Sequence, residues 1–375
     1  MSPAREARRA EALESFRVRG MPHRRFEHWR YSDLRAVLDA GQVAQAGTAK
    51  WAIEHLPEGV EMFDLGKNGA PDWVLKHLGS IGNRPTMEEA SLAFAEGGVA
   101  LRVPKGKVIA EPITLAISGA GNLRWLIVLE EGAEATIYEP HSHDAGLLRN
   151  VGVEIALAPR AELRHVRFSP FAPRSFTVEH IAVTVSQDAR YRAHFANFGS
   201  RLSRTELHIN LQGEGSEAHL SGVTVLGTDG HADVTSHIEH TAGKTLSTQL
   251  FKHVAGGKSR AVYQGKITVR EGANGSDSRQ TARALLMSER AEADLKPELI
   301  IFADDVKCAH GATTGDLDPE ALFYMTSRGI PEKDARRLLI NAFLEEAVEA
   351  IANEELRATV WHEVEHALPR AMEAK

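Results

Sequence analysis

The chain contains a single cysteine, and a histidine stands two residues after it. Because a strand places residues i and i+2 on the same face, an extended conformation would point the Cys308 thiol and the His310 imidazole the same way. Thiolate sulfur and imidazole nitrogen both bind transition metals, but two ligands are too few to hold iron or zinc. The pair predicts half of a metal site that a partner chain completes. The alternative is a small buried cysteine beside a surface histidine.

A second candidate site is the sequence His-Glu-Val-Glu-His at residues 362–366. On a helix, His362 and His366 lie one turn apart and could bind zinc, with Glu363 as general base. A catalytic zinc needs a third protein ligand, and the extended form of this motif has Gly and His where this chain has Pro369 and Met372. A zinc-dependent hydrolase is therefore the alternative hypothesis, together with a cytoplasmic β-helix carbohydrate enzyme.

Polar residues alternate with apolar ones from His231 to His240. Alternation puts His231, His237 and Glu239 on one face of a strand, which predicts a solvent or interface surface, with a metal site there as the alternative. Gly257-Lys258-Ser259 resembles the end of a phosphate-binding loop, but that motif needs a glycine where Lys252 stands. We therefore expect this chain to bind no nucleotide.

The bulk properties are those of a globular protein. Of 375 residues, 43% are hydrophobic and 25% are charged, with a net charge of −7, and the length predicts two or three structural units. One cysteine excludes an internal disulfide and fits a reducing compartment. No apolar run is long enough to span a membrane, and no apolar signal core is present, so we expect a cytoplasmic protein. Residues 1–35 hold nine Arg, but with little aromatic interleaving, so no nucleic-acid partner is expected.

The periodicity of the chain changes twice. Residues 4–19 are amphipathic with helical spacing, residues 29–38 form another helical piece, and residues 90–305 alternate apolar and polar in short runs. Within these runs a turn-then-strand pattern recurs at Ala133, Ala161, Ala189 and Ser216, in steps of 28, 28 and 27 residues. A nearly constant step predicts stacked turns of a solenoid.

The C-terminal part is expected to be helical. Asp318 can cap a helix that begins at Pro319 and ends at Gly329, and Pro331 opens a longer one. The longer helix has an apolar stripe at i, i+3 and i+4 spacing. The stripe consists of Ala335, Leu338, Leu339, Ala342, Phe343, Ala347 and Ile351. A last helix is expected from about Glu354 to Leu368, stopping at Pro369.

Four motifs resemble those of the SufB/SufD family of iron–sulfur cluster assembly proteins. They are Glu27–Leu34 near the N-terminus; Ile238-Glu239-His240 with 247–252; Gly265-Lys266-Ile267 with Ser278-Arg279-Gln280; and 302–313 running on to 323–330. The resemblance implies a mainly β fold, with a right-handed parallel β-helix core at residues 86–307. It also implies an N-terminal helical segment at 1–85 and a C-terminal helical domain at 308–375.

The resemblance also implies a function. Members with few cysteines are non-enzymatic scaffolds that form a heterodimer with a cysteine-rich SufB-like homologue and bind a SufC-like ABC-type ATPase through C-terminal helices. It places His310 and Cys308 at a transient iron or iron–sulfur cluster shared with that partner, and the ATPase contact near Phe323, Tyr324 and Arg328. With one cysteine the chain cannot hold a whole cluster, which takes four ligands. The isolated chain is also a candidate homodimer.

Overall fold

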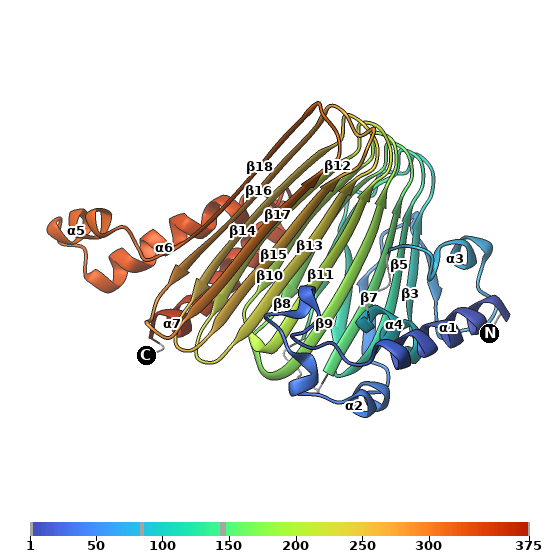
Figure 1. The fold of residues 1–375 in the computed structure, drawn as a ribbon, viewed down its shortest axis with the longest axis horizontal. Helices are drawn as coiled ribbons and strands as arrows, with labels where there is room; N and C mark the ends of the chain where they lie inside the picture. The colour runs from blue at the N-terminus through green and yellow to red at the C-terminus, as the bar shows by residue number, and fades with distance from the viewer. Residues whose placement is uncertain (1–2, 83–85, 143–147, 374–375) are drawn as a thin grey trace.

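The computed structural model describes residues 3–82, 86–142 and 148–373. Two long sheets wind around a common core as a β-solenoid of about eight turns, flanked by helices at both ends of the chain (Figure 1). The first sheet consists, in spatial order, of β1 (Lys50–His55), β4 (Ile113–Ser118), β6 (Glu134–Pro140), β8 (Glu162–Ser169), β10 (Arg190–Asn197), β12 (Glu217–Leu226), β14 (Leu246–Ala255), β16 (Ser276–Leu286) and β18 (Val306–Gly315). The second consists of β17 (Glu292–Ile301), β15 (Arg260–Val269), β13 (His231–His240), β11 (Ser200–Leu211), β9 (Ala172–Val185), β7 (Leu148–Leu157), β5 (Gly121–Leu129), β3 (Gly98–Val103) and β2 (Glu61–Asp64). The expected mainly β, parallel solenoid is confirmed.

The repeated turn of the sequence marks one complete winding of the solenoid. Glu134, Glu162, Arg190 and Glu217 are register partners on four neighbouring parallel strands. The residue two positions before each of them has a left-handed backbone, at Gly132, Arg160, Asp188 and Gly215. The residue that follows this bend is small and fully buried, as at Ala133 and Ala161. The step therefore reflects a bend that turns a small side chain into the core at each winding.

The N-terminal end of the solenoid is closed by antiparallel strands and short helices. β1 pairs antiparallel with β4, and β2 pairs antiparallel with β3. The helices are α1 (Pro3–Arg19), η1 (Glu27–Trp29), η2 (Leu34–Ala36), α2 (Ala40–Gln45), α3 (Asp72–His77) and α4 (Thr86–Phe94). The expected N-terminal helix is present, whereas the helical piece expected at 29–38 contains only the single 3₁₀ turn η2, with η1 ending at its first residue. The antiparallel strands β1 and β2 were not expected from the sequence.

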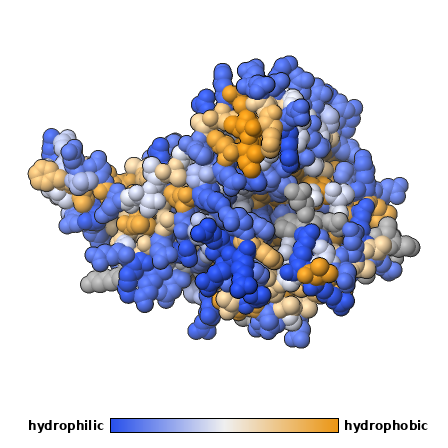
Figure 2. All heavy atoms as spheres, in the orientation of Figure 1, coloured by the Kyte–Doolittle hydropathy of each residue, from blue (hydrophilic) through white to orange (hydrophobic). Residues whose placement is uncertain are grey.

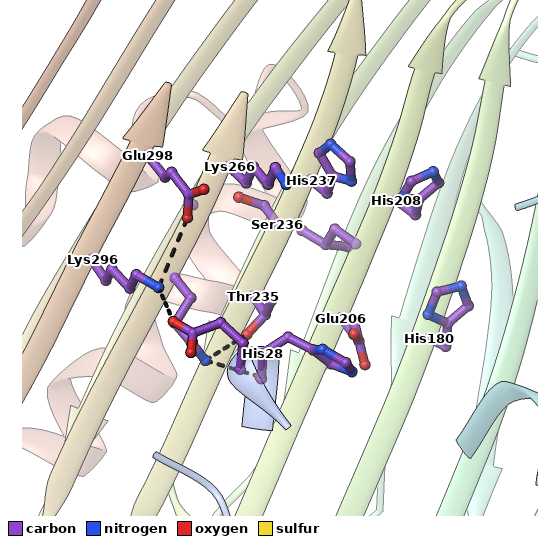
Figure 3. A pocket seen from close by; sticks show the side chains of 14 residues that line it. His28, His180, Glu206, His208, Thr235, Ser236, His237, Lys266, Lys296 and Glu298 are labelled. Carbon is purple, nitrogen blue, oxygen red and sulfur yellow. Dashed lines mark hydrogen bonds and ion pairs between the residues drawn. The ribbon is translucent and has the colours of Figure 1, made fainter. Parts of the chain in front are cut away.

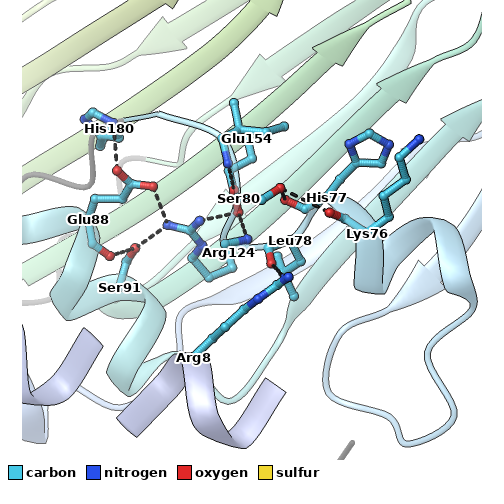
Figure 4. Close-up of polar contacts among 12 residues, drawn as sticks. Arg8, Lys76, His77, Leu78, Ser80, Glu88, Ser91, Arg124, Glu154 and His180 are labelled. Atoms are coloured by element: carbon cyan, nitrogen blue, oxygen red, sulfur yellow. Dashed lines mark hydrogen bonds and ion pairs between the residues drawn. The ribbon is translucent and has the colours of Figure 1, made fainter. Parts of the chain in front are cut away.

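A buried charge network fastens α4 to the second sheet (Figure 4). The Arg124 guanidinium lies between the Glu88 and Glu154 carboxylates, and all three side chains are buried. Glu88 also contacts His180 at 2.9 Å, and Glu154 accepts hydrogen bonds from the backbone N–H groups of Gly79 and Ile81. Burial opposes the charge on Glu88, but His180 and Arg124 outweigh it and lower the pKa of that carboxyl.

Three helices follow the solenoid. They are α5 (Pro319–Ser327), α6 (Glu332–Val348) and α7 (Glu354–Glu373). α6 and α7 bury an apolar face against the first sheet. α5 has no buried residue and extends away from the solenoid as a helical arm (Figure 1). The Asp318 side chain caps α5, and Gly329 has the left-handed backbone that ends it.

Two expectations for these helices are wrong. α7 does not stop at Pro369 but runs to Glu373, because Leu368 and Ala371 on either side of the proline are buried and hold the last turn in place. Leu338 and Ala342 of the expected stripe are exposed. Ile340, Leu344 and Val348 are buried with Ala335, Ala347 and Ile351.

The division of the chain into three parts stays a prediction. The last strand, β18, runs past the expected boundary at residue 307 to Gly315. In the described residues, no helix is both long and apolar enough to cross a membrane.

Candidate metal and partner-binding site

The C-terminal end of the solenoid is open. β18 pairs only with β16, and β17 pairs only with β15, so each has one edge without a described partner strand. Both strands are ten residues long, and β18 stays in register with β16 along its whole length. A long, regular edge presents a row of unpaired backbone N–H and C=O groups, which is a template for adding another strand.

Cys308 and His310 lie on β18 and face the interior of this last turn. Cys308 is the register partner of Ser278, and His310 is the partner of Gln280. Both partners are fully buried core residues of β16, so the side chains above them point to the same side. Cys308 is half-buried against the apolar cluster of Ile267 and Val269, whereas His310 is exposed. The stretch is therefore extended, and the two side chains share one face at the mouth of the solenoid.

The interior beneath these residues is polar. A chain of hydrogen bonds runs from His240 Nε2 to Ser247 Oγ at 2.9 Å and on to Ser278 Oγ at 2.6 Å, directly below Cys308. A second chain runs from the Gln280 amide, which donates to Tyr263 Oη at 2.7 Å, to Gln249 Oε1 at 3.1 Å. These two hydrogen-bond chains connect the core to the last, open turn of the solenoid.

Gln280 links two of the sequence motifs. A Cβ at Gly265 would lie 1.5 Å from the Gln280 amide nitrogen, so only glycine leaves the space that this side chain fills. The Gln280 Oε1 atom, one strand below His310, has no hydrogen-bond partner among the described residues. A buried acceptor without a donor is costly, so this atom is available to a group that completes the turn.

The Cys308 thiol is not activated in the isolated chain. Burial raises its pKa, and the nearby Asp277 carboxylate adds to the effect. At neutral pH the thiolate, which is the form that binds metal and acts as a nucleophile, is therefore only the minor form of this side chain. A metal cation at this position would remove the proton on binding.

Hydrophobic side chains surround the open turn. Leu295 and Leu299 of β17 face the core but remain half-buried, since no further turn of the described chain covers them. Ile301 and Phe302 are 42% and 59% exposed. Figure 2 shows hydrophobic residues gathered on the upper part of the solenoid and at the far end of the helical arm. Exposed apolar groups beside an unpaired strand edge are typical of a protein interface.

The three residues expected at the ATPase contact lie together on the arm. Phe323 and Tyr324 of α5 are 73% and 59% exposed, and the Arg328 guanidinium lies over the Tyr324 ring at 4.9 Å. Since α5 packs on α6 and not on the solenoid, this surface is free of the core.

The zinc motif lies on the solvent face of α7. His362 and His366 are exposed, with ring centroids 4.2 Å apart, and Glu363 lies beside them. Among the described residues, no His, Cys, Asp or Glu from another element joins this group. Without a third ligand, Glu363 would have to serve as ligand and base at once.

Ser278 and Gln280 beneath the site were not singled out as site residues from the sequence. The repeat could have indicated them, because stacked residues recur once per winding. Cys308 follows its register partner Ser278 by 30 residues, whereas the windings of the first sheet in the middle of the chain repeat every 27 or 28 residues. Extending the shorter repeat to this end therefore pairs the wrong residues.

Comparisons with known proteins agree on one family. Residues 116–343 match the model described as "SUF system FeS cluster assembly, SufBD core domain". The chain is 30% identical to the iron–sulfur cluster assembly protein SufD of Escherichia coli, over 93% of this chain and 90% of that protein. It is 33% identical to a SufBD family protein of Synechocystis over 61% and 52% of the two chains, and 28% identical to one of Mycobacterium tuberculosis over 96% and 93%. The chain therefore belongs to the SufB/SufD family of iron–sulfur cluster assembly proteins, resembles SufD over nearly its whole length, and has a role in iron–sulfur cluster assembly.

Proposed function

We propose that this chain is a non-enzymatic scaffold subunit of a cytoplasmic complex that assembles iron–sulfur clusters. Its open end pairs with a cysteine-rich SufB-like homologue, and its α5 arm contacts a SufC-like ATPase. The observation that carries the proposal is the uncapped last turn, in which Cys308 and His310 face the mouth of a polar core.

The chemistry of the site requires a partner. One thiolate and one imidazole can each fill one position on iron, and the remaining ligands must come from another chain. A homologue with the same solenoid could extend both sheets at once, since β17 and β18 end at the same mouth. Its ligands would then stand across the junction from Cys308 and His310, in a site that exists only while the two chains are paired.

Strand addition also explains the half-buried leucines. A further turn would cover Leu295 and Leu299 and supply backbone partners to β18. Such pairing gives affinity through main-chain hydrogen bonds and specificity through the side chains that alternate inward. Pro297 lacks an N–H, so it marks one point on β17 where a partner strand gains no hydrogen bond from it. The same edge accepts a second copy of this chain when the homologue is absent.

The proposed ATPase contact rests on the exposed aromatic pair of α5. Aromatic and Arg side chains are enriched at the centres of protein interfaces, and here Phe323, Tyr324 and Arg328 form one small surface. Residues 318–375 hold twelve acidic residues against seven Lys and Arg, and two of the acidic ones, Glu345 on α6 and Glu349 at its C-terminal cap, are exposed. A basic partner surface would match this acidic surplus.

The test is co-expression of the three chains followed by affinity capture. We expect this chain to recover both the SufB-like homologue and the ATPase. Removing residues 318–375 is unsuitable, because α6 and α7 cover an apolar face of the first sheet. Phe323→Ala combined with Tyr324→Ala leaves that face intact, and should abolish ATPase capture while the homologue is still recovered.

The matched control is Val108→Ala, an exposed hydrophobic residue far from the arm in the sequence and 66% exposed. It should capture both partners. Normal ATPase capture by the double α5 variant would show that the ATPase binds elsewhere.

A further inference from the structure

Two histidines and a glutamate come together on the outer face of the second sheet. His208 on β11 and His237 on β13 are direct register partners, and Glu239 follows two residues after His237 on the same face. The two rings are 4.9 Å apart between centroids, at 72° to each other. One ligand atom from each of the three residues lies within 4.8 Å of the others.

His208 and His237 border a cavity of about 360 Å³ (Figure 3). The figure shows the His208 and His237 rings beside each other on neighbouring strands, with His180 on the next strand. The η1 segment lies over the lower part of the cavity, held by the His28 carbonyl, which accepts hydrogen bonds from Arg204 and Gln264. The two imidazoles are thus partly shielded from solvent but still open to a chamber that can hold small ligands.

Both imidazoles are neutral at pH 7. Burial lowers the pKa of His237 to about 4, with His208 adding to the effect, and burial also lowers the pKa of His208. A neutral imidazole binds a metal without first losing a proton. Neither ring nitrogen of His208 has a hydrogen-bond partner among the described residues, although the side chain is only 9% exposed.

The surroundings would orient the ligands. The Thr268 hydroxyl lies 3.0 Å from His237 Nε2 and fixes that ring. Glu239 contacts both His237, at 3.5 Å, and the Arg270 guanidinium, at 2.9 Å, through Oε1, which leaves Oε2 for another contact. Outer hydrogen bonds of this kind set the tautomer and position of metal-binding side chains.

We propose that His208, His237 and Glu239 form a binding site for a divalent first-row transition metal, Fe²⁺ or Zn²⁺. Two imidazoles and one carboxylate on one side of the ion leave further positions open toward the cavity, which is the donor set of open iron and zinc sites. Lys266, the register partner of His237 on β15, adds a positive charge beside the site that opposes a bound cation, so the negative charge of Glu239 is needed to hold the ion. The site is complete within this chain, unlike the one at Cys308 and His310.

The experiment uses the full chain, stripped of metal with a chelator and titrated anaerobically with Co²⁺ while visible absorption is recorded. We expect one Co²⁺ per chain with absorption typical of nitrogen and oxygen ligands, displaced by Zn²⁺, and a parallel dialysis against Fe²⁺ to give the same stoichiometry. His208→Ala and His237→Ala should each weaken Co²⁺ binding by more than about 100-fold, and Thr268→Val by roughly tenfold. Circular dichroism checks that each variant is folded, and Glu239→Gln replaces any histidine variant that is not.

Two controls separate this site from the other metal candidates. His310→Ala, and His362→Ala with His366→Ala, should leave the Co²⁺ affinity unchanged. The proposal is overturned if the wild-type chain takes up no Co²⁺ at millimolar concentration, if binding survives in the folded triad variants, or if it disappears in the His362/His366 variant. Because no partner chain is present in this assay, its outcome is independent of the proposed complex.

Discussion

The two ends of the solenoid are made of the same kind of strand, but they finish in opposite ways. At the N-terminal end, β1 and β2 close both sheets with antiparallel pairing; β2 has only four residues, and β1 has a register shift between Ile53 and His55. Its exposed residues include Lys50 and Glu54. At the C-terminal end, β17 and β18 are long and regular, with exposed apolar residues beside them.

Short, irregular and charged edges are how proteins prevent unwanted strand pairing. The N-terminal end has all three features. At the C-terminal end β17 carries charged residues and Pro297, but the free edge of β18 lacks a bulge and carries Lys307 as its one side chain with a fixed charge. A chain that protects one edge and leaves the other open is built to add strands in one direction. The unprotected end is also the end with the cysteine.

The largest effect is expected from opening the closed end. Arg124→Met removes a buried cation from between Glu88 and Glu154, and leaves Glu88 with only His180 and Glu154 with only backbone N–H groups to offset their buried charge. We expect a loss of about 3–5 kcal/mol in the free energy of unfolding, measured with urea. Arg279→Met on β16 is the matched control, since its side chain is 72% exposed, and it should change stability by less than about 0.5 kcal/mol. Equal losses of stability in the Arg124→Met and Arg279→Met variants would show that the buried charge network does not stabilise the N-terminal end.

A smaller effect is expected from blocking the open end. Ala312 faces the mouth of the last turn and is exposed, so Ala312→Lys places a charge where an added strand would bury it. The free energy of binding to the SufB-like homologue should fall by about 2 kcal/mol, or roughly thirtyfold in affinity, as measured by titration. Ala52→Lys on exposed β1 makes the same change at the closed end and should leave the affinity as it is. If only the β1 variant lost binding, the interface would lie at the N-terminal end, and the proposed pairing through β18 would be wrong.

Buried histidines should also differ in their response to acid. Burial lowers the pKa of His240 and of His253 to about 4, from an unfolded value near 6.5. The unfolded state therefore binds more protons between these values, and the free energy of unfolding should fall as pH decreases from 6.5 to 4. For His180, burial is outweighed by Glu88, which raises its pKa, so its contribution is present below 6.5 and is lost only as pH rises through the folded value.

Urea unfolding of His253→Asn across this pH range checks the prediction. The variant should show a shallower fall in stability than the wild type, because one buried neutral histidine is gone. An unchanged slope would mean that His253 does not titrate as its burial indicates.

The smallest effect concerns the thiol. Because burial raises the pKa of Cys308, iodoacetamide should alkylate it more slowly at pH 8 than it alkylates glutathione. Pairing with the homologue should slow the reaction further. Faster alkylation than glutathione would show an activated thiolate that needs no metal to deprotonate it.

The sequence predicted the parts of the molecule that repeat. The solenoid could be inferred because each winding brings a small buried residue to the same place, as at Ala161 and Ala189. β1 and β2 could not, since each is short and gains its stability from pairing with a distant strand. The continuation of α7 through Pro369 was missed for a similar reason: buried neighbours compensate for one lost hydrogen bond.

The candidate sites differ in the same respect. Cys308 and His310 are close in sequence, so strand periodicity alone was enough to place them on one face. The partner of His237 is His208, which lies one winding earlier, and only the strand register connects them. Local spacing finds sites within an element, whereas sites between elements need the register.

The central claim is that the open end supplies ligands to cluster assembly, and His310→Ala tests it most directly. The imidazole is exposed, so the fold and capture of both partners should be retained. Cluster formation by the purified three-chain complex, followed by its visible absorption under iron and a sulfide source, should slow by at least about tenfold. His362→Ala, another exposed histidine, should assemble clusters at the wild-type rate. A wild-type rate in His310→Ala would contradict the account, and would place the assembly site wholly in the partner.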